Sequence, residues 1–194
     1  MSAIRALLLS ALFAPSLAWA GSWTIDPAHT RVGFEVSHMM ISSVEGDFSD
    51  VSGKASFEPG DLKSLSVQVE VGIASVDTRN ADRDAHLVKA DFFDVANHPK
   101  MTFVSTRVKP GKDGTFELTG NLTLRGVTKP IVLVGKGLDQ VVKDPWGNER
   151  VGASATGTLN RHDFGVSFNQ ALETGGVLVG DEVTLNLAVE LIRQ

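Results

Sequence analysis

Apolar and polar residues alternate along most of the chain. The alternation is clearest in residues 65–73 (LSVQVEVGI), 116–125 (FELTGNLTLR) and 183–191 (VTLNLAVEL), where apolar side chains occupy alternate positions. A period of two is typical of a β-strand with one buried face and one face in water. Weaker alternation predicts further strands at Thr30–Ser37, Val44–Phe57, Met101–Lys109, Ile131–Val142 and Arg150–Asn160.

Short turn-forming segments separate these strands. Residues 110–115 (PGKDGT) contain an Asp-Gly pair, which is typical of a tight β-hairpin turn. Residues 58–64 (EPGDLKS) and 144–149 (DPWGNE) place Pro and Gly where turns use them. We therefore predict one all-β domain of about eight antiparallel strands.

Such strands bury their apolar faces either in a two-sheet sandwich or in a sheet closed into a barrel. The stretch 151–159 (VGASATGTL) places the small residues Ala153, Ala155 and Gly157 on its apolar face. Small residues leave space, and a barrel of about eight strands is wide enough to hold one small ligand. The pattern leaves open a solid core instead, filled by Phe34, Phe48, Phe103 and Phe116.

Residues 77–95 (DTRNADRDAHLVKADFFDV) interrupt the alternation with many charged side chains. Asn80 is a good N-cap, and the acidic residues that follow it suit the first turn of a helix. We therefore predict one short helix near residues 80–90, which docks on the barrel through Leu87 and Val88.

The charged run has three possible uses. It can simply cover a flank or an end of the sheet, or Arg83 and His86 can donate hydrogen bonds to the polar head of a ligand. The third use is acid–base catalysis by Asp84 and His86. Those two residues are two positions apart, so on a helix they point in different directions.

The sequence predicts no metal site and no cofactor. The five His residues, at positions 29, 38, 86, 98 and 162, lack the close spacing typical of zinc ligands. The absence of Cys excludes thiol catalysis, disulfides and cysteine metal sites. A second charged cluster, NRHDFG, is interpreted as an Arg–Asp interaction of Arg161 and Asp163 that pins a loop, with Asp84 or Arg83 as further possible partners.

Residues 1–20 have the features of a secretory signal peptide. Arg5 precedes an apolar run at 6–14, and AWA at 18–20 is a small-residue cleavage site. We expect cleavage after residue 20, export, and a mature domain spanning 21–194. The apolar run is too short to cross a bilayer, so we expect no stable membrane insertion. A formal net charge of −5 at pH 7 makes nucleic acid a poor partner.

Blocks of sequence along nearly all of residues 21–194 carry a resemblance to a known family. They are WTIDPAHTRVGFEVSH (23–38), GDFSDVSGKASFEP (46–59), SVDTRNADRDAHLVKADFFDVANHPKMTFVST (75–106), TGNLTLRGVTKPIVL (119–133) and NRHDFGVSF (160–168). In these blocks the chain resembles the YceI-like, polyisoprenoid-binding family. It departs from the family pattern at His162, where Ser or Ala is expected.

The resemblance implies an elongated, lipocalin-like barrel of about eight antiparallel strands that binds a ligand without converting it. The apolar lumen would hold the tail of an isoprenoid lipid, either a polyprenyl compound or an isoprenoid quinone. Family members with a signal peptide are periplasmic, so the periplasm is the expected location. With a lumen, the alternating strands predict ligand contacts at Val32, Phe34, Val36, Phe48, Val67, Val69, Val71, Phe103, Phe116, Leu118, Leu122, Ala153, Ala155, Leu185 and Leu187.

The leading hypothesis is therefore a non-catalytic binder or carrier of isoprenoid lipids, with Arg83 and His86 as candidate contacts to the head group. The alternative is a hydrolase or isomerase of a small metabolite that uses His86 and Asp163 at the barrel mouth. A third hypothesis is an interaction protein with a solid core. The sequence identifies no particular lipid and leaves open whether the protein forms a homodimer.

Overall fold

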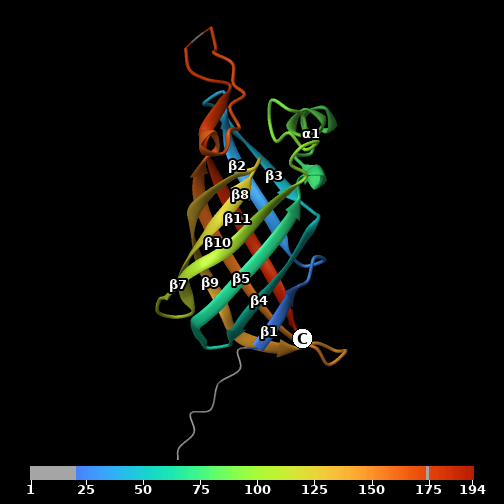
Figure 1. Cartoon of the computed structure of the whole chain (residues 1–194), viewed down its shortest axis with the longest axis vertical. Coiled ribbons are helices and arrows are strands. Elements are labelled where there is room, and N and C mark those ends of the chain that lie inside the picture. Colours follow the sequence, from blue (N-terminus) through green and yellow to red (C-terminus); the bar gives the residue numbers. More distant parts are fainter. Residues whose placement is uncertain (1–20, 174) are drawn as a thin grey trace, which may run out of the picture.

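The computed structural model describes residues 21–173 and 175–194 as a β-barrel with one α-helix, α1 (Ala81–Leu87) (Figure 1). The predicted signal peptide at residues 1–20 lies outside the described residues. The strands are β1 (Gly21–Ile25), β2 (Arg31–His38), β3 (Ser42–Phe48), β4 (Val51–Glu58), β5 (Asp61–Gly72), β6 (Val76–Asp77), β7 (Lys100–Pro110), β8 (Thr115–Leu124), β9 (Val127–Lys143), β10 (Glu149–Asn160) and β11 (Val179–Arg193). Two short 3-10 helices are η1 (Ile73–Ser75) and η2 (Arg161–Phe164).

The sheet closes on itself because β1 pairs with β4 on one side and with β11 on the other. All of the strand pairs are antiparallel, and the ring forms an eight-stranded barrel. Farther along the barrel, β2 replaces β1 beside β11, and β3 pairs with β2. The predicted fold class is therefore confirmed, and the barrel replaces the sandwich that the pattern had left open.

The single strand predicted at Val44–Phe57 is wrong, because the chain turns a corner at Ser49 and Asp50 and forms β3 and β4 instead. The hydroxyl of Ser75 accepts hydrogen bonds from both corner amides, at 3.1 and 2.9 Å. Phe48 and Val51, on either side of the corner, are both buried. The corner shifts the buried positions from even to odd numbers, so the change of phase between Phe48 and Val51 is the one sign of it in the pattern.

The predicted hairpins and the predicted helix are confirmed. The segment PGKDGT joins β7 to β8, and DPWGNE joins β9 to β10. The Asn80 side chain caps α1 by accepting a hydrogen bond from the Arg83 amide at 3.0 Å. No helix among residues 21–173 and 175–194 has the length and apolar character needed to cross a membrane.

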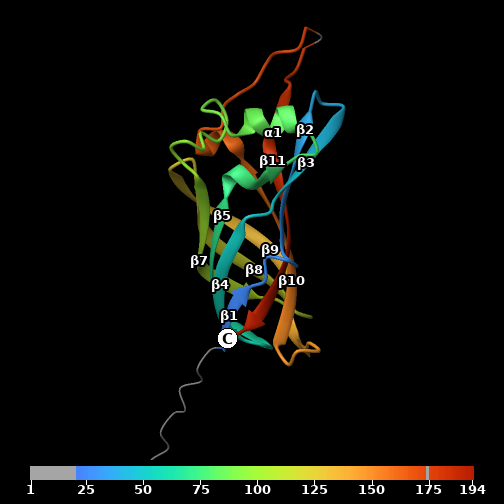
Figure 2. The same cartoon turned by 90° about the vertical axis from the view of Figure 1, so that its right-hand side faces the viewer.

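Residues 78–99, which connect β6 to β7 and include α1, form a segment that we call the lid. The lid lies across one end of the barrel (Figure 2). Phe92 is buried, and Leu87, Val88 and Phe93 pack against the barrel core. This packing fixes the lid on the barrel end, as predicted for Leu87 and Val88.

The opposite end of the barrel is filled by aromatic side chains. The rings of Trp23 and Phe57 stack with centroids 5.2 Å apart, and both residues are fully buried. The indole N–H of Trp23 donates to the Phe57 carbonyl at 3.2 Å. Aromatic pairs of this kind add about 0.5–1.5 kcal/mol beyond the area that they bury.

A network of ion pairs at the same end is centred on Arg150. Its guanidinium donates to carboxylates of Asp26 and Glu190 at 2.6 Å each, and to Asp144 at 2.7 Å. Hydrogen bonds from His29 and Arg150 lower the pKa of Asp26 from 3.8 to about 2. The hydrogen bonds to Asp144, Asp26 and Glu190 raise the pKa of Arg150. The network therefore joins β10, β11 and the turn after β1.

We expect Asp26→Asn to destabilise the fold at neutral pH by about 1–3 kcal/mol, because charged hydrogen bonds are lost. The pKa of Asp26 is depressed in the folded state, so its contribution is present above pH 3.8 and disappears as the pH falls through about 2. Urea unfolding at a series of pH values should show that the difference in free energy of unfolding between wild type and variant disappears over that range. Asp139→Asn, at an exposed position of β9, is the matched control. A difference in free energy of unfolding that is as large at pH 2 as at pH 7 would show that the Asp26 charge does not stabilise the fold.

Candidate ligand-binding site

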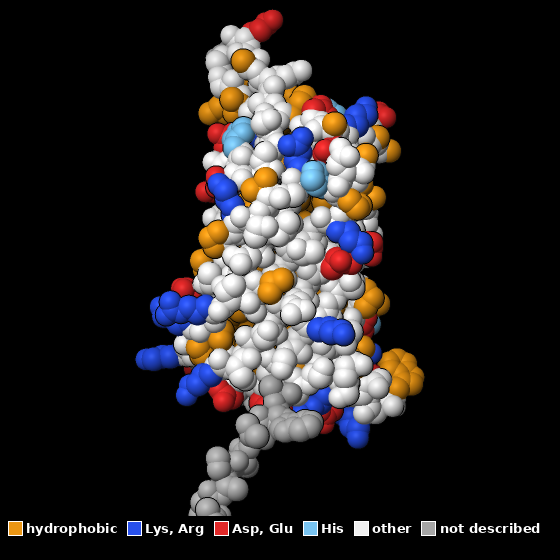
Figure 3. All heavy atoms as spheres, viewed as in Figure 1, with side chains coloured by type: hydrophobic (Ala, Val, Ile, Leu, Met, Phe, Trp, Pro, Cys, Tyr) orange, Lys and Arg blue, Asp and Glu red, His pale blue; other side chains and the backbone are white. Residues whose placement is uncertain are grey.

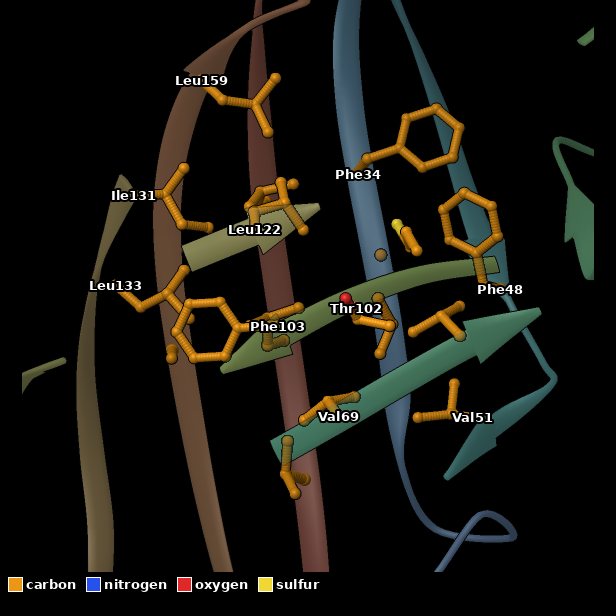
Figure 4. A pocket seen from close by; sticks show the side chains of 18 of the residues that line it. Phe34, Phe48, Val51, Val69, Thr102, Phe103, Leu122, Ile131, Leu133 and Leu159 are labelled. Atoms are coloured by element: carbon orange, nitrogen blue, oxygen red, sulfur yellow. The ribbon is translucent and has the colours of Figure 1, made fainter. Parts of the chain in front are cut away.

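A cavity with a volume of about 250 Å³ runs through the barrel. Its wall is made almost entirely of aliphatic and aromatic side chains that point inward from the strands (Figure 4). The residues that the sequence predicts as ligand contacts all line this cavity: Val32, Phe34, Val36, Phe48, Val67, Val69, Val71, Phe103, Phe116, Leu118, Leu122, Ala153, Ala155, Leu185 and Leu187. Their contact with a ligand remains a prediction.

The large Phe side chains leave the lumen open because their rings lie over glycines of the barrel wall. Phe34 pairs across the sheet with Gly46, and a Cβ atom at Gly46 would approach the ring to 2.5 Å. Phe116 covers its cross-strand partner Gly135 in the same way. Each ring thus occupies space vacated by a missing side chain. The hypothesis of a core filled by Phe residues is therefore wrong.

The lid supplies cavity residues that the sequence analysis missed. Leu87, Phe92 and Phe93 line the cavity at the end of the barrel. Leu87 was predicted to dock on the barrel, but no periodicity marks Phe92 and Phe93, because they lie in a connector outside α1. The tandem Phe residues inside a charged run are the one signal that could have identified them.

Arg161 is a buried cation at the same end of the cavity, with only 4% of its surface exposed. Its guanidinium donates to the backbone carbonyls of Val166, Phe168, Val179 and Gly180, at 2.7 to 3.3 Å. Burial lowers its pKa. The donors are directed at the backbone, so Arg161 ties residues 166–168 to the start of β11.

The predicted pairing of Arg161 with Asp163 is wrong, and the side chains of Arg83 and Asp84 bind Thr78 instead of either residue. Asp163 accepts a hydrogen bond from Lys129 at 2.7 Å, whereas the carboxylate nearest to Arg161 is that of Asp181, at 3.5 Å. These two positions of η2 point in different directions, so Asp163 faces the solvent and Arg161 faces the interior.

Two further contacts attach the lid to the rest of the barrel end. The rings of His86 and Phe92 from the lid pack against Phe168, with centroids 4.9 and 4.8 Å from it. Arg125 donates to the carbonyl of Ala90 in the lid at 2.7 Å and to that of Gly165 at 2.8 Å. The lid is therefore joined to residues 165–168 as well as to the strands.

The two predicted head-group residues do not line the cavity. Arg83 donates to the hydroxyl and the carbonyl of Thr78, at 2.7 and 2.8 Å, so its guanidinium braces the start of the lid. The His86 Nε2 atom lies 2.7 Å from a carboxylate oxygen of Asp91. This contact lowers the pKa of Asp91. A role of either residue in head-group binding remains a prediction.

The geometry gives no support to the catalytic alternative. His86 pairs with Asp91, whereas Asp84 accepts hydrogen bonds from the amide and hydroxyl of Thr78. Asp163, the other residue of that hypothesis, is paired with Lys129. Among the described residues, no Ser or Thr hydroxyl is hydrogen-bonded to a His ring, so none of these pairs is arranged to activate a hydroxyl nucleophile.

Asp26, His29 and Glu190 bring possible metal ligands within 4.8 Å of one another. Sequence spacing could not reveal this trio, because Glu190 is distant in the chain. The Arg150 guanidinium already lies between the two carboxylates and supplies the positive charge. We therefore interpret the trio as part of the ion-pair network.

Most charged side chains lie outside the cavity. On the face shown in Figure 3, Lys, Arg, Asp and Glu are distributed over the outer surface, and exposed apolar side chains occur in small separate spots. The residues that line the cavity are apolar apart from the charged Arg161 and Lys54, the polar Thr30, Thr102 and Ser154, and Gly33. The geometry therefore suits an apolar ligand or an apolar part of a ligand.

Curated relatives resemble the chain over almost its whole length. A UPF0312 protein of Ectopseudomonas mendocina is 40% identical and covers 100% of this chain and 98% of its own. A UPF0312 protein of Azotobacter vinelandii is 39% identical, with 95% of this chain and 94% of its own covered.

Solved structures share the fold. The YCEI protein of Campylobacter jejuni is 36% identical, with a TM-score of 0.70 over 87% of this chain and 96% of its own. A polyisoprenoid binding domain from Saccharophagus degradans matches at 15% identity, with a TM-score of 0.64 over 89% of this chain and 98% of its own. The family model of the YceI-like domain matches residues 23–191. The chain therefore belongs to the YceI-like family, as its sequence blocks predicted.

Proposed function

We propose that the protein is a non-catalytic binder of isoprenoid lipids and holds the lipid tail in the barrel cavity. The apolar cavity carries this proposal, because a lumen left open behind Phe–Gly contacts has space for a ligand that water rejects. The polyisoprenoid binding domain of Saccharophagus degradans, which has the same fold, supports the choice of ligand class. A binding role also agrees with the lack of an aligned nucleophile among the described residues.

The hydrophobic effect sets the tail length that useful binding requires. Burial of one methylene group contributes about 0.8 kcal/mol, so about ten groups contribute roughly 8 kcal/mol. That free energy corresponds to a dissociation constant near 1 μM, before the cost of immobilising a flexible chain. A long tail is therefore needed. Apolar walls discriminate weakly between tails that differ by one methylene, so we expect tolerance of tail length.

A neutral head group fits this protein better than a strongly anionic one. The formal net charge is −5 at pH 7. Arg161, the buried cation beside the cavity, directs its donors to backbone carbonyls. We therefore favour an isoprenoid quinone over a polyprenyl pyrophosphate.

We also propose that the protein acts in the periplasm after removal of residues 1–20. The support is the order of features at the N-terminus, where a cation, a short apolar run and AWA follow one another. In that compartment a lipid with a long tail needs a carrier to cross water, because the tail must be kept out of contact with water. An apolar lumen can shelter the tail in this way.

Solvent extraction of the purified protein, followed by mass spectrometry, should recover an isoprenoid lipid in a stoichiometric amount. Delipidated protein should in turn take up an isoprenoid quinone presented in detergent. An extract without lipid, together with no uptake, would overturn the proposed function. An extract of straight-chain fatty acids would retain a lipid carrier but reject the isoprenoid class.

Ala155→Phe should weaken binding of a long-chain isoprenoid quinone at least about tenfold, a loss of about 1.4 kcal/mol. Ala155 lines the cavity, and its cross-strand partner Gly135 is already covered by the ring of Phe116, so an added ring would project into the lumen. Thr156→Phe, at the exposed neighbouring position of β10, is the matched control and should bind like wild type. Both affinities can be measured by titration of delipidated protein. Equal weakening in the two variants would show that Ala155 does not act through the lumen.

Intact-mass measurement of the protein from the periplasmic fraction should give a chain that begins at Gly21. The expectation follows from cleavage after the small residues at 18–20. A mature chain that retains residues 1–20, or protein confined to the cytoplasmic fraction, would refute export.

A further inference from the structure

The wall of the barrel contains a seam between β9 and β10. Their hydrogen-bonded register runs from Lys143–Glu149 to Val134–Thr156 and ends there. Beyond that point β9 remains paired with β8, and β10 remains paired with β11. The facing edges of residues 127–133 and 157–160 therefore have no strand-to-strand ladder. Pro130 lies in this stretch and has no N–H to donate.

A crevice on the outer surface lies over this seam, bordered by Lys129, Asp163 and Glu182. Two of its lining residues, Ile131 and Leu159, also line the internal cavity. Figure 4 shows both side chains on neighbouring strands, directed into the barrel. At the seam, Ile131 and Leu159 lie between the internal cavity and the crevice, one on each strand.

Entry at either end of the barrel requires many contacts to break. The lid end is held by the Arg125 hydrogen bonds, by the packing of His86 and Phe92 on Phe168, and by the carbonyls gathered around Arg161. The other end is filled by the Trp23–Phe57 stack and the Arg150 network. At the seam, rotation of the two aliphatic side chains breaks no β9–β10 backbone hydrogen bond, because the ladder has already ended there. The Lys129–Asp163 hydrogen bond at 2.7 Å is the contact beside the crevice that has to open.

We propose that lipid tails enter and leave the cavity sideways, through the seam between β9 and β10, with Ile131 and Leu159 as the gate. The ligand class is a flexible branched aliphatic tail, which can pass such a gate one segment at a time. The polar head stays at the crevice until the tail is inside. This inference rests on the proposed lipid-binding function and adds its route.

The test is a reversible clamp across the seam. Val132→Cys with Thr158→Cys places one thiol on each strand, at exposed positions that both line the crevice. The chain has no Cys of its own, so the bond that forms is unambiguous. The probe is all-trans-retinol, a fluorescent isoprenoid alcohol, delivered from phosphatidylcholine vesicles. Uptake by the oxidised variant should be at least tenfold slower than by the same variant after reduction.

The matched control is Val134→Cys with Thr156→Cys, at the last pair of the ladder and on the same outer face. Its oxidation should leave the uptake rate within twofold of the reduced form, because those strands are already joined. A second control, Arg125→Met, removes the hydrogen bonds that hold the lid. Uptake should remain unchanged in this variant. A large acceleration there, with no effect of the seam clamp, would place the route at the lid.

A gate-opening variant keeps the proposal testable if the clamp fails to oxidise. Ile131→Ala combined with Leu159→Ala removes both gate side chains, and uptake and release of retinol should both accelerate at least tenfold. Unchanged rates in a folded double variant would overturn the seam route. Equilibrium binding distinguishes failure of the proposed function from failure of the proposed route. If the wild type binds neither retinol nor an isoprenoid quinone, the proposed function fails. If it binds them normally and the clamp does not change the uptake rate, only the route is rejected.

Discussion

The interior of this barrel must be apolar and unfilled at the same time, and most of the structure follows from that constraint. An empty apolar space forfeits the dispersion contacts that stabilise an ordinary core. The stability has to come from elsewhere, and the structure places it at one end, in the Trp23–Phe57 stack and the Arg150 network. The ring of ladders that closes through β1 and β11 supplies the rest.

The features that the sequence predicted well are local ones. Alternation identified the strands and their inward faces, because the period of two is a property of each strand alone. Asn80 identified α1 because a cap acts within one turn. The corner at Ser49 escaped because its partner, Ser75, is distant in sequence, and because the change of phase between Phe48 and Val51 is a shift of only one position. β1 is short and lies beside an Asp-Pro turn, so alternation could not establish it.

The polar contacts of the barrel ends were the least predictable part. A charged residue in a sequence shows that a partner is needed without showing which one, and here several partners are far apart in the chain. Asp26 meets Arg150 because the sheet closes into a barrel. Arg125 meets Ala90 because the lid folds over the end of the barrel. Arg161 satisfies its donors with backbone carbonyls, which carry no sequence signal at all. The assignment of Arg83 and His86 to a ligand head group had the same weakness, since both side chains have partners within the lid.

Because of the Phe–Gly contacts, the width of the lumen depends on glycines in the wall of the barrel. A side chain at Gly46 or Gly135 would push the ring of Phe34 or Phe116 off the sheet and toward the axis. One added methyl group on the strand backbone would therefore displace a whole aromatic ring into the lumen, a large change in usable width for a small change in sequence. In this architecture the width of the lumen is set at wall glycines that do not themselves line the cavity.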